Sequence, residues 1–148
     1  MTMIKYLLVF CCCICAHFSV IAQDSILGNW KGVITQDDGG YRSEYEFELY
    51  LKKEDKLITG RSYVYVDEIY AEMALSGFTL NDQIFHFTES KVVRSRKLPQ
   101  LEWCLKGAAL ELKRTGSGWE LRGRWQGVSN GGNCIPGEII LKKVVPRV

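Results

Sequence analysis

The sequence predicts an all-β domain, most simply an up-and-down β-barrel of about eight antiparallel strands. Short runs in which apolar and polar residues alternate recur along the chain, and turns rich in Gly, Asp and Asn separate them roughly every 8 to 12 residues. No segment carries a convincing helical period. An even number of strands lets the first and the last pair and close the sheet. A two-sheet β-sandwich is the alternative architecture.

The first half of the chain supplies five of these strands. One of them alternates apolar residues with glutamates, so its apolar face should meet the core and its glutamates should meet water. The turn "DDGGY" precedes that strand, and Asn81-Asp82 is the last turn of this half. The five strands are expected at 29–36, 44–53, 57–66, 69–80 and 83–90.

The second half begins with a basic loop around Arg94, Arg96 and Lys97. This loop is most simply solvated, and an anionic partner is the alternative. Three further strands are expected at 101–114, 118–127 and 137–144.

The strand that begins "LEWCL" has an alternation that slips. Its first three apolar residues share a face, which puts Cys104 and Lys106 together on the solvent side. Leu110 and Leu112 have the opposite parity, so we expect a β-bulge or a break at 107–109.

The first 23 residues, "MTMIKYLLVFCCCICAHFSVIAQ", have the order of a secretory signal peptide. Lys5 precedes an apolar run, which is too short to span a membrane, and cleavage is expected after Ala22 or Gln23. A lipoprotein site is the alternative, although Phe10 and Ile14 before the cysteines fit it poorly. A single domain, 24–148, would then be exported to the periplasm or the exterior.

Removal of that segment leaves two cysteines, Cys104 and Cys134, and one histidine, His86. A disulfide is the simplest interpretation in an oxidising compartment, and two buried free thiols are the alternative. Two distant cysteines and one histidine do not complete a four-ligand zinc site, so no metal or other cofactor is expected.

Composition excludes several classes of partner. The chain has 148 residues, 47% hydrophobic and 24% charged, which is ordinary for one globular domain. The net charge of +2 is too small and dispersed to indicate nucleic-acid binding. We expect a monomer.

Two stretches resemble known proteins. "LGNWKG" resembles the Gly-x-Trp first strand of lipocalin-like and avidin-like barrels. The pattern from Trp103 to Lys143, with its paired cysteines and Pro-Gly, resembles small secreted β-barrel proteins of Bacteroidota. The resemblance implies the barrel but no ligand, because the biotin-binding residues of avidins have no counterpart in this chain.

Catalysis finds little support in the sequence, and the protein is not expected to be an enzyme. Every nucleophilic scheme would need His86, which alternates with two phenylalanines on a strand and is better explained as a structural residue. Paired carboxylates on one strand form a solvated stripe rather than a cleft.

Aromatic residues at strand positions are either barrel core or the wall of a ligand cup. In "LITGRSYVYV" the face carrying Arg61 could look inward and offer a charge to an anionic ligand, but β-branched residues pack small barrels well, so the valine face is expected inside. The candidate ligand-binding residues are Trp30, Arg61, Tyr63, Tyr65, Trp119 and Trp125.

The sequence therefore predicts a binding module for a small apolar or aromatic ligand, and an anionic group on that ligand is an option. The alternative is a protein-interaction module such as a protease inhibitor, because exported eight-stranded barrels with one disulfide are similar to certain bacterial metalloprotease inhibitors.

Overall fold

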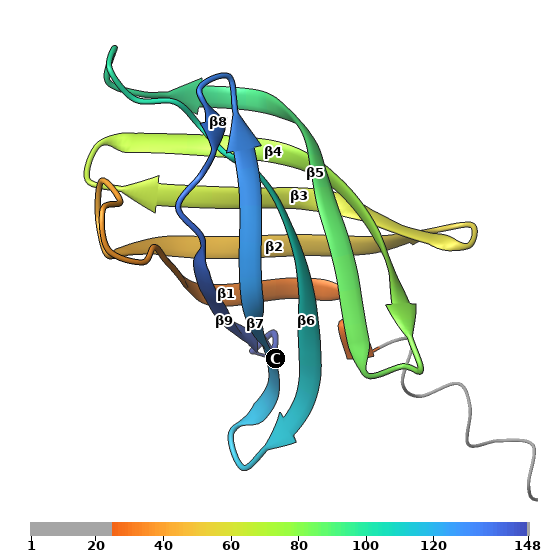
Figure 1. Cartoon of the computed structure of the whole chain (residues 1–148). Helices are drawn as coiled ribbons and strands as arrows, with labels where there is room; N and C mark the ends of the chain where they lie inside the picture. The colour runs from red at the N-terminus through yellow and green to blue at the C-terminus, as the bar shows by residue number, and fades with distance from the viewer. Residues whose placement is uncertain (1–24, 148) are drawn as a thin grey trace, which may run out of the picture.

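The computed structural model describes residues 25–147. The expected signal peptide, with its four cysteines, lies outside this range. Within it the chain forms nine strands (Figure 1): β1 (Gly28–Thr35), β2 (Glu44–Glu54), β3 (Leu57–Val66), β4 (Ile69–Leu80), β5 (Ile84–Arg96), β6 (Leu105–Thr115), β7 (Gly118–Ser129), β8 (Gly132–Asn133) and β9 (Gly137–Lys143).

Eight of these strands close into an antiparallel barrel. Each of β1 to β7 pairs with the next strand along the chain, and β9 then pairs with both β7 and β1. The two-residue strand β8 pairs with β7 alone and lies outside the barrel. The predicted up-and-down barrel is confirmed. The part of the chain that the structure describes has no helix long and apolar enough to cross a membrane.

The predicted basic loop is wrong in part, because β5 continues through it to Arg96. Arg94, Ser95 and Arg96 pair with the first residues of β4, beginning at Tyr70. Two register shifts along this pairing show that β5 carries extra residues relative to β4. Alternation is lost at such bulges, so this half of β5 has no strand pattern in the sequence.

The predicted start and parity of the sixth strand are also wrong. It begins at Leu105, and 101–104 is a non-strand segment. Lys106 points inward with Leu110 and is only 4% exposed. The register with β5 and β7 is continuous around 107–109, so the expected bulge is absent there.

The barrel has two ends, which we call the mouth and the base. The mouth is formed by 36–43, 67–68, 97–104 and 129–136, and the base by the turns after β2, β4 and β6. At the base, the buried side chain of Ile26 contributes to the core, and its carbonyl accepts a hydrogen bond from Trp30 Nε1 at 2.8 Å. The base is thus closed by chain that precedes β1, whereas the mouth is hollow.

Candidate ligand-binding site

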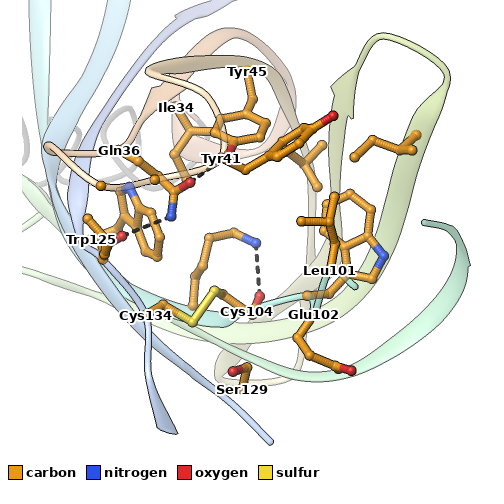
Figure 2. Close-up of a pocket in the computed structure, with 17 residues that line it drawn as sticks. Ile34, Gln36, Tyr41, Tyr45, Leu101, Glu102, Cys104, Trp125, Ser129 and Cys134 are labelled. Carbon is orange, nitrogen blue, oxygen red and sulfur yellow. Dashed lines mark hydrogen bonds between the residues drawn. A yellow bond between two sulfur atoms is a disulfide. The ribbon is translucent and has the colours of Figure 1, made fainter. Parts of the chain in front are cut away.

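The mouth contains a cavity of about 270 Å³. Its wall is mainly aromatic and aliphatic, with a few polar groups and the two cysteines among them (Figure 2). The apolar lining residues are Ile34, Tyr41, Tyr45, Val64, Ile69, Leu101, Trp103, Trp125 and Ile135; the polar ones are Gln36, Glu102, Lys106 and Ser129. A second hollow, beside the turn between β2 and β3, has mostly exposed lining residues and no enclosing wall.

Hydrogen bonds hold the β1–β2 turn against the segment 129–136. Gln36 Nε2 donates to the carbonyl of Ile135 at 3.1 Å, and Gln36 Oε1 accepts from the Tyr45 hydroxyl. The same hydroxyl accepts from the backbone N–H of Arg42 at 3.1 Å. Trp125 Nε1 donates to the carbonyl of Thr35 at 2.8 Å. These contacts fix one side of the cavity.

The opposite side is fixed by a disulfide between Cys104 and Cys134, which confirms the predicted pairing. Their Cα atoms are 6.3 Å apart, and the bridge crosses the lower wall of the cavity in Figure 2. Both cysteines lie outside the strands, so the bridge joins the segment 97–104 to the segment 129–136. The prediction that it is attached to the outside of the sixth strand is therefore wrong.

A buried ion pair lies at the floor of the cavity. Lys106 Nζ is 2.9 Å from Glu89 Oε2, and the two side chains are 5% and 0% exposed. The same carboxylate oxygen accepts from the backbone N–H of Lys106 at 2.8 Å, and Oε1 accepts from the Ser62 hydroxyl. Every oxygen of this carboxylate therefore has a donor, which is the condition under which a buried charge is tolerated.

Sequence reasoning missed this pair, although one signal for it exists. Glu89 has the same parity as Phe85 and Phe87, which are both buried in β5. Lys106 has the same parity as Leu110 in β6. Two opposite charges on apolar faces of adjacent strands are the pattern that would have indicated an internal ion pair.

Of the six predicted ligand-binding residues, only Trp125 lines the cavity. Trp30 is fully buried beside the base, and Trp119 lies at the start of β7, also at the base, where Arg114 stacks over its ring. Trp103, which was not among the candidate ligand-binding residues, lines the cavity, and its Nε1 is buried without a hydrogen-bond partner among the described residues.

The other three predicted residues lie on the outer face of β3. The expected inward face is confirmed, because Ser62 and Val64 are buried and Arg61, Tyr63 and Tyr65 alternate with them. Arg61 Nε contacts Glu72 Oε1 at 3.2 Å. The arginine therefore does not stand inside the barrel.

Burial perturbs the ionisation of one tyrosine of the cavity. Desolvation raises the pKa of the Tyr45 phenol above its ordinary value, opposed by the hydrogen bond from the Arg42 backbone. On the outer face, partial burial is also the first cause of the raised pKa values of Tyr63 and Tyr65, with nearby carboxylates adding to it.

Comparison of the chain with protein families, with curated proteins and with solved structures finds no match. The resemblance to lipocalin-like secreted barrels therefore stays a prediction.

Within residues 25–147, no three His, Cys, Asp or Glu side chains gather in a way that could hold a metal ion. His86 stacks on Phe78, with ring centroids 5.2 Å apart, on the outer side of β4 and β5.

Proposed function

We propose that this protein is an exported binding module that takes a small, mainly apolar or aromatic ligand into the cavity at the barrel mouth. The observation that carries the proposal is the cavity itself, which is lined by Trp103, Trp125 and Tyr45 and is partly open to solvent. Its volume of about 270 Å³ lies just below the usual range for ligand sites, about 300 to 1,000 Å³, which favours a small molecule.

The surroundings of the cavity support binding rather than a merely incomplete core. Its walls are held by a disulfide and by the Gln36 side chain, so the hollow is preorganised. A preorganised site loses less conformational entropy when a ligand binds. The disulfide also supports export, because such bonds persist in oxidising compartments.

A titration with a neutral, environment-sensitive naphthalene dye, 6-propionyl-2-(dimethylamino)naphthalene, tests the proposal. Wild type should give a saturable rise in dye fluorescence. Leu101→Trp should fill the mouth and weaken binding by about tenfold or more, equivalent to about 1.4 kcal/mol. Leu101 lines the cavity from the segment 97–104.

Leu98→Trp is the matched control. Leu98 is in the same segment but is 38% exposed and does not line the cavity, so this variant should bind the dye as wild type does. Absence of saturable binding to wild type, or equal binding by Leu101→Trp, would overturn the proposal.

A further inference from the structure

The ammonium group of Lys106 has one donor more than the protein uses. Of its three N–H groups, one is directed to Glu89 Oε2 at 2.9 Å. A second is directed to the carbonyl of Cys104 at 3.3 Å, which is the dashed line that ends at Cys104 in Figure 2. No third oxygen among the described residues accepts from it. The ring of Phe47 also faces this ammonium group, with its centroid 5.6 Å from Nζ.

This donor belongs to a residue that lines the cavity, although its side chain is only 5% exposed. A hydrogen bond from a charged donor in such a dry place is stronger than one in water. A ligand atom that accepts this hydrogen bond would therefore be held at the floor, while the rest of the ligand contacts the aromatic wall.

The local charge determines which acceptors fit. Glu89 already neutralises Lys106, so the buried pair carries no net charge. The other charged side chain of the cavity wall is Glu102, whose carboxylate lies 3.8 Å from Lys97 Nζ, so this pair also leaves no uncompensated cation. An anionic ligand would add an uncompensated negative charge to a poorly solvated cavity, and this is costly.

We infer, on the basis of the proposed function, that the cavity selects neutral aromatic molecules that carry a hydrogen-bond acceptor, such as a ketone, and that Lys106 Nζ donates to this acceptor. Glu89 and Ser62 position the ammonium group and do not touch the ligand. The inference replaces the anionic ligand class that the sequence suggested with a neutral one.

Three naphthalenes of similar size test the ligand class by calorimetry: 2-acetylnaphthalene, 2-ethylnaphthalene and 2-naphthoate. The ketone should bind about tenfold tighter than the hydrocarbon, the usual gain from a hydrogen bond to a charged group. The carboxylate should bind more weakly than the ketone. Equal binding of ketone and hydrocarbon would overturn the inference and leave the proposed function standing, whereas no binding of any of the three would overturn both.

The role of Lys106 is tested with the paired variant Lys106→Met/Glu89→Gln, which removes both charges together and leaves no unpaired ion. The tenfold preference for the ketone should disappear in this variant while 2-ethylnaphthalene still binds. The matched control is Lys31→Met/Glu48→Gln, which removes an exposed ion pair of 2.9 Å on the outside of β1 and β2. A ketone preference that survives in the first variant would overturn the inference.

A measurement on wild type alone covers the case in which the paired variant does not fold. The infrared carbonyl stretch of bound, ¹³C-labelled 2-acetylnaphthalene should lie at lower frequency than in hexane, because a hydrogen bond from an ammonium group weakens the C=O bond. A stretch at the hexane frequency would overturn the inference.

Discussion

Tyr45 connects the cavity to the hydrogen bonds that shape it. Its hydroxyl donates to Gln36 and accepts from the backbone of Arg42, and its ring lines the cavity. Because burial raises the pKa of this phenol, the folded protein favours the neutral form more strongly than the unfolded chain does.

The pH dependence of stability should reveal this preference. A group whose pKa is raised by folding stabilises the protein fully below the unfolded value, here 10.0, and loses that contribution as the pH rises through the folded pKa. We expect the free energy of unfolding to fall as the pH rises above about 10, and to fall less in Tyr45→Phe. Urea denaturation at each pH measures it.

Tyr50→Phe provides the control for that series, because Tyr50 is 48% exposed on the outside of β2. Its alkaline loss of stability should equal that of wild type. If Tyr45→Phe loses as much stability as wild type over the same pH interval, the phenol does not contribute as described.

The interior ion pair marks the limit of prediction at the scale of residues. The alternation of β2 correctly assigned Tyr45 and Phe47 to the inner face. Lys106 was assigned to the outside because the parity of "LEWCL" was carried forward into β6, although 101–104 is not part of that strand. Pattern on one strand rarely assigns a charged residue to the interior, because the partner that makes its burial possible can lie on another strand, as Glu89 does for Lys106.

At the scale of elements, β3 depends on a glycine at its inner face. A Cβ built on Gly60 would lie 1.9 Å from the carbonyl oxygen of Tyr50 on the neighbouring strand β2. Gly60→Ala should therefore force the two strands apart and lower the free energy of unfolding by about 2 kcal/mol or more. Urea denaturation followed by tryptophan fluorescence measures the loss.

Gly107→Ala is the comparison for this substitution. Its Cβ would meet the carbonyl oxygen of Phe87 at 3.5 Å, an ordinary contact, in the strand β6. Little change or a slight gain in stability is expected there, because alanine restricts the unfolded chain. Similar losses for the two variants would show that close approach between strands is not the cause.

The disulfide is the second element-scale feature with a measurable contribution. It closes a sequence separation of 30 residues and joins the segment 97–104, which lies between β5 and β6, to the segment 129–136. Cys104→Ala/Cys134→Ala should lower the free energy of unfolding by about 2 to 5 kcal/mol. A thiol reductant should destabilise wild type by a similar amount and leave the double variant unchanged; a wild-type transition insensitive to complete reduction would contradict this account.

The strand elements themselves were largely predictable, and the missed part of β5 has a physical cause. The bounds of β3 and β4 agree with the sequence prediction, because clear alternation runs between clear turns. The second half of β5 was missed, because its residues 91–96 are exposed and pair with β4 across two irregularities. Where no face is buried, no period-two pattern is required.

At the scale of the whole molecule, closure of the barrel gives the two ends different properties. Ser25 and Ile26 are buried at the base, where Lys143 Nζ donates to the carbonyl of Ser25 at 2.6 Å. The mouth instead retains the cavity. The strand count predicted closure, but which end stays hollow depends on segments outside the strands, whose contacts carry no periodic signal.

The contacts at the base also constrain where a signal peptide can be cleaved. Cleavage beyond Ile26 would remove a core side chain that is 1% exposed and the acceptor of the Trp30 indole. We therefore expect the exported chain to begin at Gln23 or Asp24, as the small residues before that point indicate. Intact-mass measurement of the secreted protein, with its disulfide retained, tests this: a mass that includes any of Cys11 to Cys15, or one that lacks Ile26, would contradict it.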